Sequence, residues 1–199
     1  MTYQSDPIAA TVFWIVVACW LSFGMILAIG KRGSAKGDAK RDVKSMLGLL
    51  LQMAAYAICF VFSRTYFSPF LPMSKTTEIV VGALTALLAL ASIWFCYAAV
   101  RTLGKHWALA ARVIEGHELV QQGPFAVVRN PIYFAMLGVL IAVGLAVTRW
   151  QVLLAAIVLY LLGTWVRVHS EEKLLGQAFG AKFDDYARRV PALLPRLFR

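Results

Sequence analysis

Long apolar runs separated by short charged segments constrain this chain more than any other feature of its sequence. Hydrophobic residues make up 60% of the 199 residues, and the mean hydropathy of +0.70 lies well above that of an ordinary soluble domain. A helix needs about 20 apolar residues to cross a hydrocarbon layer about 30 Å thick. Several runs approach that length, so we expect an all-α integral membrane protein with about five transmembrane helices.

The apolar runs divide the chain into two parts. The predicted spans are Ile8–Gly30, Met46–Tyr66, Ile79–Val100, Ile132–Val147 and Trp150–Val166. Only Thr148 and Arg149 separate the last two spans, which predicts a tight antiparallel hairpin. Residues 1–100 form a three-helix transmembrane region in this interpretation. Residues 101–199 hold nearly all the concentrated polar chemistry.

The distribution of Lys and Arg predicts the orientation of the spans. Of the 20 basic residues, 17 lie in the segments 31–44, 101–129 and 167–199, which five spans place on one side of the membrane. The positive-inside rule then puts the N-terminus outside and the C-terminus in the cytoplasm, and we expect a multi-pass protein of a bacterial inner membrane. This topology, with contact to anionic membrane lipids, accounts for the net charge of +10. Because no soluble face interleaves basic and aromatic residues, no nucleic-acid partner is expected.

The cysteine and histidine residues predict no metal site. Cys19, Cys59 and Cys96 each fall inside a predicted span, and their spacing matches neither a disulfide framework nor a metal motif. The three histidines also lack a recognised ligand spacing. We expect the cysteines to be small buried apolar side chains.

A polar segment, residues 116–133, leads into the fourth span. Gly123-Pro124 is a turn signal. Asn130 is a preferred N-cap residue, and Pro131 is favoured at the first helical position. We therefore expect the fourth helix to begin here, with free N–H groups suited to a carboxylate or phosphate.

A second polar segment continues the fifth helix beyond its apolar part. Arg167 and Glu171 are four residues apart and share one helical face, which predicts an intrahelical salt bridge. Glu172 lies about 100° further around the helix, so it needs a different partner. The two polar segments flank one hairpin, so we expect them to meet at one membrane surface.

The tail predicts a short amphipathic helix that ends near Pro191. Phe179, Phe183 and Tyr186 recur at helical spacing, with charged residues between them. Such a helix either lies on the membrane surface or caps a site below the hairpin.

The polar residues of the second half occur in a specific order. The ordered set is His117-x-Leu119-Val120, Gly123-Pro124-Phe125, Arg129-Asn130-Pro131-x-Tyr133, Arg167-x-x-x-Glu171-Glu172, Phe179-Gly180, Tyr186 and Arg189-Val190-Pro191. This order resembles the isoprenylcysteine carboxyl methyltransferase family and, more distantly, the phospholipid N-methyltransferases. Both are integral membrane enzymes that use S-adenosylmethionine. The resemblance covers about residues 100–197, half of the chain.

The resemblance implies a pocket for S-adenosylmethionine at the cytoplasmic surface. The residues that it places against the cofactor are His117, Glu118, Leu119, Val120, Phe125, Asn130, Pro131, Ile132, Tyr133 and Glu171. It places Arg167 beside the carboxylate of the substrate as the catalytic residue. This chain departs from the family pattern at Asn130, where the family usually has His, and at Phe125, where it usually has Tyr.

The implied reaction is methyl transfer to a carboxylate of a lipophilic, prenyl- or lipid-like substrate, as in an isoprenylcysteine-type O-methyltransferase. A carboxyl group with a pKa near 4 is already ionised at neutral pH, so no general base is needed. Two alternatives stay open. Asn130 and Phe125 keep open a non-catalytic membrane protein with a degenerate pocket. A sterol-reductase-like enzyme would use NADPH, and it would require a longer bundle with basic residues for the nucleotide.

Overall fold

The computed structural model describes residues 6–32, 43–65, 68–70, 74–104 and 119–195. These residues form helices and no strand, which confirms the all-α prediction for the described part of the chain. The elements are α1 (Pro7–Arg32), α2 (Val43–Val61), α3 (Lys75–Leu103), the short 3-10 helix η2 (Gly123–Ala126), α4 (Pro131–Val147), α5 (Trp150–Phe179) and α6 (Ala181–Arg189).

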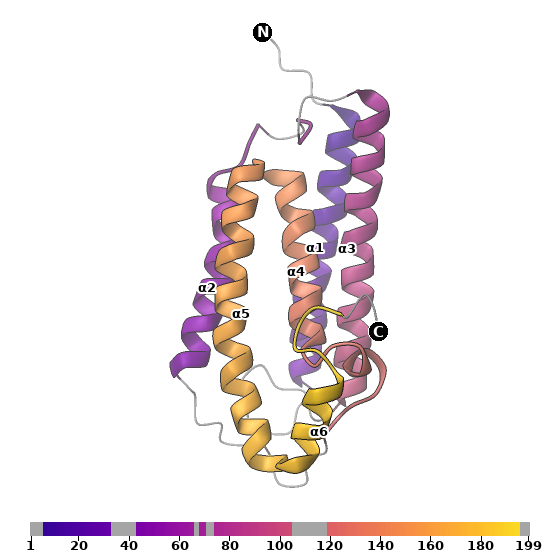
Figure 1. Cartoon of the computed structure of the whole chain (residues 1–199). Helices are drawn as coiled ribbons and strands as arrows, with labels where there is room; N and C mark the ends of the chain where they lie inside the picture. Colours follow the sequence, from indigo (N-terminus) through magenta and orange to yellow (C-terminus); the bar gives the residue numbers. More distant parts are fainter. Residues whose placement is uncertain (1–5, 33–42, 66–67, 71–73, 105–118, 196–199) are drawn as a thin grey trace.

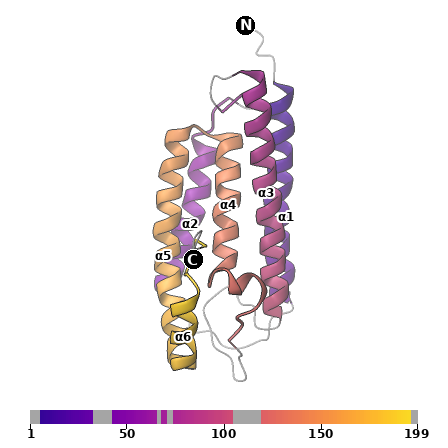
Figure 2. The same cartoon turned by 45° about the vertical axis from the view of Figure 1, so that its right-hand side comes forward.

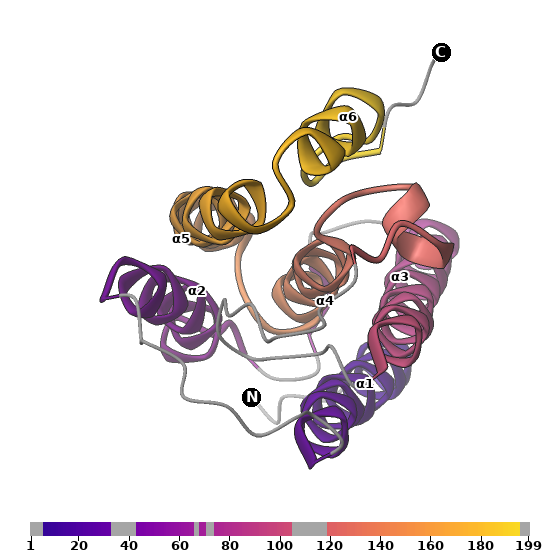
Figure 3. The same cartoon turned by 90° about the horizontal axis from the view of Figure 1, so that it is seen from below.

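Helix α4 lies at the centre of the bundle. Seen from below, it stands between a pair formed by α2 and α5 and a pair formed by α1 and α3 (Figure 3). Figure 2 shows α1 and α3 side by side along most of their length. The 17 residues of α4 rise about 25 Å, less than the ~30 Å of a hydrocarbon core. Because its neighbours surround much of α4, this short helix is mostly buried in protein.

Three helices of the described chain are long and apolar enough to cross a membrane. Their apolar stretches are Pro7–Gly30, Lys75–Leu103 and Trp150–Phe179, and two shorter apolar helices accompany them. Many large apolar side chains point outward, among them Leu50, Trp94 and Trp165, each more than 60% exposed. A surface of this kind suits lipid rather than water. The five-span arrangement, its orientation and the division into two halves stay predictions.

The hairpin of α4 and α5 follows the sequence prediction closely. α4 ends at Val147, α5 begins at Trp150, and α5 continues beyond its apolar part to Phe179. Figure 1 shows α6 at the lower end of the bundle, beside the end of α5. The polar residues of the second half therefore gather at one end.

Helices α2 and α5 approach one another closely at two glycines. A Cβ atom on Gly48 would lie 2.5 Å from the Arg167 side chain and 2.6 Å from the Gly163 carbonyl oxygen. A Cβ atom on Gly163 would lie 2.7 Å from the Gly48 carbonyl oxygen. Small residues of this kind let helix backbones touch, and here they bring α2 against Arg167.

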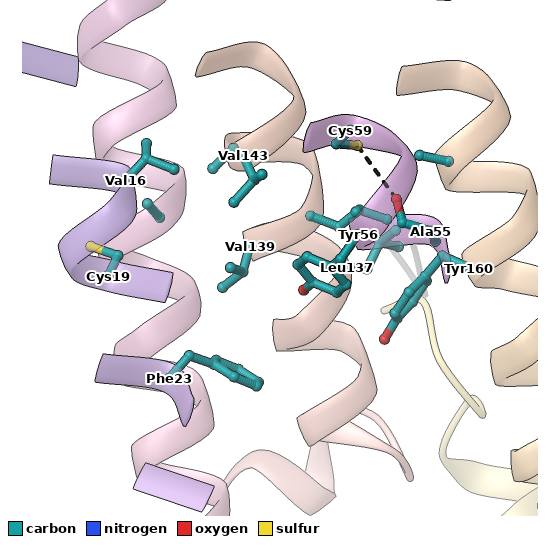
Figure 4. Close-up of a cluster of buried hydrophobic side chains, with 14 of the residues drawn as sticks. Val16, Cys19, Phe23, Ala55, Tyr56, Cys59, Leu137, Val139, Val143 and Tyr160 are labelled. Carbon is teal, nitrogen blue, oxygen red and sulfur yellow. Dashed lines mark hydrogen bonds between the residues drawn. The ribbon is translucent and has the colours of Figure 1, made fainter. Parts of the chain in front are cut away.

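The apolar core joins the helices of both halves of the chain. In the close-up, Val16, Cys19 and Phe23 lie to one side of Val139 and Val143, and Tyr56 and Tyr160 lie to the other (Figure 4). The three cysteines are buried and form no disulfide, as predicted.

The upper end of the bundle differs from the prediction. The second span was expected to reach Tyr66, but α2 ends at Val61. Ser63 instead forms an isolated bridge with Thr148. The guanidinium of Arg64 then donates to the carbonyl oxygens of Thr148 at 2.6 Å and Leu145 at 2.9 Å. A cation that binds the last carbonyl oxygens of α4 stabilises the C-terminus of that helix. Arg64 makes this contact from the non-helical segment that follows α2.

Candidate functional site

The first turn of α4 meets the polar part of α5 through Tyr133 and Glu171. The Tyr133 hydroxyl donates to Oε1 of Glu171 at 2.5 Å. The carbonyl oxygen of Tyr133 accepts from the hydroxyl of Tyr160, about two turns before the polar part of α5, at 2.8 Å. The predicted meeting of the two polar segments is confirmed by these contacts.

Arg167 lies buried between Tyr133, Glu171 and helix α2. Its Nη2 donates to Oε1 of Glu171 at 3.4 Å, which confirms the predicted intrahelical pair. Its guanidinium carbon lies 5.0 Å from the centre of the Tyr133 ring, a cation–π geometry. Its Nη1 lies 3.4 Å from the Gln52 side-chain oxygen. The cation is thus held by a carboxylate, an aromatic face and an amide.

Gln52 is a site residue that sequence reasoning missed. Its side chain is fully buried on α2 and donates to the Thr164 hydroxyl at 2.9 Å. A signal was present, since Gln52 is an amide inside an otherwise apolar span, and polar residues in such spans often face the bundle interior. The sequence could not show that α2 lies against α5.

Glu172 has the separate partner that its position predicted. Arg129 donates to its two oxygens, from Nε at 2.8 Å and from Nη2 at 2.9 Å, in a bidentate fork. The remaining Nη1 of Arg129 donates to the carbonyl oxygens of Ala187 at 2.9 Å and of Val190. One side chain therefore connects the entry to α4, the polar part of α5 and the end of α6.

Asn130 occupies the predicted N-cap position but its side chain does not cap α4. Its amide nitrogen donates to the Ala192 carbonyl oxygen at 2.9 Å and, more weakly, to Glu172 at 3.4 Å. Asn130 and Pro131 therefore begin α4 as the sequence predicted, whereas the Asn130 side chain binds the C-terminal segment instead of the first turn of the helix. The N–H groups of Ile132 and Tyr133 lie in the first turn of α4, where the helix itself offers them no acceptor.

Helix α6 packs onto the protein with its apolar face. Phe183, Tyr186 and Val190 are buried. The residues packed around them are Leu119, Leu175, Phe179 and Ala187. The Tyr186 hydroxyl donates to the carbonyl oxygen of Phe125 in η2 at 2.7 Å, and burial raises the pKa of Tyr186 to about 12. α6 therefore covers the segment that leads into α4.

Most of the predicted site residues that the structure describes lie at one end of the bundle. Phe125 and Pro131 are buried, and Leu119, Val120 and Ile132 are partly buried. His117 and Glu118 lie outside the described residues. The cofactor pocket as a whole therefore stays a prediction.

The charges of the site are paired and shielded from water. The side chains of Arg167 and Glu171 are 7% and 20% exposed, and those of Arg129 and Glu172 are 12% and 22% exposed. Tyr133 and Arg167 both donate to the first oxygen of Glu171, Oε1, and neither of these contacts uses the second oxygen, Oε2. It can therefore receive a hydroxyl or amino group of a bound molecule, while the first oxygen stays fixed by Tyr133.

Comparisons with known proteins found one family model and two curated relatives that are similar to part of this chain. The family model described as phospholipid methyltransferase matches residues 79–182, just over half of the sequence. The nickel-cobalt-cadmium resistance protein NccN of Alcaligenes xylosoxydans xylosoxydans is 39% identical over 100 residues. The cobalt-zinc-cadmium resistance protein CzcN of Cupriavidus metallidurans is 31% identical over 97 residues. Each match covers 48% of this chain and 45% and 44% of the two relatives, respectively, so it spans a little under half of their length.

Proposed function

Because the chain belongs to the phospholipid methyltransferase family, we propose that it is a membrane methyltransferase that uses S-adenosylmethionine. We infer further that it methylates an ionised carboxylate of a lipophilic, prenyl- or lipid-like substrate at the cytoplasmic surface of the membrane. The cluster of Tyr133, Arg167 and Glu171 at the end of the α4–α5 hairpin carries this proposal.

The residues of this end fit the cofactor. When bound, S-adenosylmethionine supplies a methyl group on a positively charged sulfur. The second oxygen of Glu171 is placed to accept from a hydroxyl or amino group, and Tyr133 holds that carboxylate in position. The N–H groups of Ile132 and Tyr133 at the start of α4 suit a carboxylate. We assign the other cofactor contacts to His117–Val120, Phe125, Asn130 and Pro131.

Arg167 favours a carboxylate as the methyl acceptor. Its guanidinium attracts an anion and can orient a carboxylate through two parallel N–H donors. An ionised carboxylate needs no general base, so the task of the site is to align the attacking oxygen. Exclusion of water then strengthens the electrostatic interactions of Arg167 with that oxygen.

The name of the matching family favours a second candidate, methyl transfer to a lipid amine. A primary amine is protonated at neutral pH, so a base must first remove its proton. Glu171 would take that role, and Arg167 would then bind the lipid phosphate. The two candidates therefore give different roles to the same two residues, Glu171 and Arg167.

Cofactor binding tests the proposed class of enzyme. Purified protein is titrated calorimetrically with S-adenosylmethionine and, separately, with NADPH. We expect binding of S-adenosylmethionine to the native chain, loss of at least tenfold in affinity in Glu171→Ala, and no loss in the control Asp184→Ala, which removes an exposed carboxylate from α6. Binding of NADPH alone would favour the reductase-like reading, and no binding of either would favour the degenerate pocket.

The chemical stability of the product separates the two acceptors. Methyl-labelled S-adenosylmethionine is supplied with a prenylated cysteine derivative or with phosphatidylethanolamine in mixed micelles. A methyl ester releases labelled methanol in mild alkali, whereas an N-methyl group does not. We expect alkali-labile label on the prenylated carboxylate, and alkali-stable label on the phospholipid alone would overturn the carboxylate assignment.

The two relatives are named for resistance to nickel, cobalt and cadmium and to cobalt, zinc and cadmium. No group of three or more His, Cys, Asp or Glu side chains able to hold a metal ion occurs in the described residues. We propose that the half of the chain shared with them contributes methyl transfer. In a strain that depends on this chain for metal tolerance, Glu171→Ala would then abolish tolerance, whereas Asp184→Ala would preserve it.

A further inference from the structure

A cleft lies at the end of the bundle opposite α6, the upper end in Figure 1. Its volume is about 370 Å³, open space at its mouth included. The first turns of α1 and α3, the end of α4, Arg64 and residues 68–70 form its walls. Most of the lining is apolar, including Ile8, Val12, Phe70, Val81 and Leu145.

Glu78 brings a carboxylate into this apolar cleft. Its side chain is only 8% exposed. Oε2 accepts from the ammonium of Lys75 at 3.2 Å. Oε1 is buried and accepts no hydrogen bond from any described residue. Leaving a buried carboxylate oxygen without a donor costs free energy. A ligand that donates a hydrogen bond to Oε1 would therefore be favoured in this cleft.

The other polar groups around the cleft already have partners within the chain. The Thr85 hydroxyl donates to the Val81 carbonyl oxygen, and the Ser68 hydroxyl donates to the Thr65 carbonyl oxygen. The Arg64 guanidinium donates to carbonyl oxygens at the end of α4 and in the segment that follows α2. Glu78 therefore decides which charge the cleft accepts.

The charges beside Glu78 favour a cation. Lys75 pairs with both Asp6 and Glu78, so two carboxylates share one ammonium. This group of three side chains keeps one net negative charge. The positive charge of Arg64 faces the carbonyl end of α4, whose dipole is negative. Glu78 would repel an anionic ligand, whereas a cationic ligand with an N–H group would supply the hydrogen-bond donor that Oε1 lacks.

We propose that the cleft binds a primary ammonium group, which donates an N–H to Oε1 of Glu78 while its short alkyl part contacts the apolar walls. An ammonium fits better than a metal ion, because the described residues supply no third carboxylate, thiolate or imidazole to complete a metal site. The ligand is either a small free alkylamine or the headgroup of phosphatidylethanolamine. This inference does not depend on the proposed methyl transfer, which concerns the other end of the bundle.

Thermal unfolding of the intact protein tests the proposal in two arms. One arm compares nanodiscs of phosphatidylethanolamine with nanodiscs of phosphatidylcholine, whose quaternary headgroup has no N–H donor. The other arm adds n-butylammonium to protein in phosphatidylcholine, with n-butanol as the uncharged control. We expect a higher midpoint with phosphatidylethanolamine if the lipid is the source, and a saturable increase with n-butylammonium if a free amine enters.

Two variants test whether the stabilisation by an amine depends on Glu78. Glu78→Gln keeps the size of the side chain and removes its charge, and we expect it to lose the amine-dependent increase. Glu78→Asp keeps the charge but withdraws it by one methylene group, and we expect at least tenfold weaker amine binding by calorimetry. Asp184→Asn serves as the control at the opposite end. An absent increase in both arms, or an equal increase in native protein and Glu78→Gln, would overturn the proposal.

Discussion

Tyr133 donates its hydroxyl to Glu171 over 2.5 Å, and this bond joins the first turn of α4 to the polar part of α5. The same tyrosine ring lies under the guanidinium of Arg167. One aromatic residue therefore orients both the carboxylate proposed to hold the cofactor and the cation proposed to hold the substrate.

Tyr133→Phe tests the first of these roles. The substitution keeps the ring under Arg167 and removes the donor to Glu171. A hydrogen bond to a charged group contributes about 1.5–3 kcal/mol, so we expect roughly tenfold or greater loss of S-adenosylmethionine affinity and a lower unfolding midpoint. Tyr97→Phe, which changes an exposed tyrosine of α3, is the control. Unchanged calorimetric affinity in Tyr133→Phe would contradict the role of the Tyr133 hydroxyl in orienting Glu171 for the cofactor.

Arg167→Lys separates substrate orientation from cofactor binding. Lysine keeps the positive charge near Glu171 but cannot present two parallel donors to a carboxylate. We expect S-adenosylmethionine affinity within about threefold of the native value and a methyl-transfer rate reduced on the order of a hundredfold. The measurements are calorimetry and single-turnover transfer of labelled methyl groups. Equal loss of binding and transfer would refute a role for Arg167 in orienting the substrate.

Gln52→Leu tests whether the first half of the chain contributes to the site. Leucine removes the amide oxygen near Arg167, and Gln52→Glu restores an acceptor at the same position. We expect Gln52→Leu to reduce kcat about tenfold while the Kd for S-adenosylmethionine stays unchanged. Recovery of kcat in Gln52→Glu would support positioning of the cation. If both variants reduce kcat and thermal stability alike, Gln52 is a packing residue only.

The fork between Arg129 and Glu172 should stabilise the lower end of the bundle. Both side chains are mostly shielded, and removing one partner leaves the other charge without compensation. A double-mutant cycle with Arg129→Ala and Glu172→Gln should give a coupling energy on the order of 2 kcal/mol. The exposed pair of Arg188 and Asp185 provides the matched control, with no measurable coupling expected. Equal coupling in the two cycles would contradict a structural role for the fork.

The contact between α2 and α5 predicts different outcomes for two glycine substitutions. Gly163→Ala places a Cβ atom 2.7 Å from the Gly48 carbonyl oxygen, so α2 must move away from Arg167. We expect a loss of about 1–3 kcal/mol in stability together with reduced methyl transfer. Gly24→Ala in α1 meets no atom within 4 Å, so the gain in helix propensity should leave stability equal or higher. A similar loss in both variants would argue against the close approach of α2 and α5.

Local patterns predicted the parts of the fold that depend on neighbours in sequence. The hairpin, the start of α4 at Pro131 and the pair of Arg167 with Glu171 all follow from helical spacing and turn residues. The meeting of Arg129 and Glu172 could not be identified in advance, because the sequence offered several basic partners for one carboxylate.

The contacts that the sequence did not predict join residues that are far apart in the chain. Gln52 reaches Arg167 only because Gly48 and Gly163 bring two helices into contact, and no single segment shows that. Arg64 lies outside the three basic segments that predict the orientation, and no local pattern shows that it binds the end of α4. Asn130 precedes α4 as its N-cap residue, yet its side chain donates to the carbonyl oxygen of Ala192, far along the chain. Each of these contacts is tertiary, so no local pattern in the sequence could show it.

The bond from Tyr186 to the Phe125 carbonyl oxygen predicts how α6 responds to alkali. The folded state raises the pKa of Tyr186 from its ordinary value near 10 to about 12. A raised folded pKa favours the protonated folded form, so this contribution to stability is complete below pH 10 and is lost as the pH rises toward 12. We expect the unfolding midpoint of the native chain to fall between pH 10 and pH 12 more steeply than that of Tyr186→Phe, which cannot ionise at this position. The difference between the two proteins at each pH isolates this residue from the other buried tyrosines. Parallel curves for the two proteins over that interval would show that α6 is not held by the Tyr186 hydroxyl.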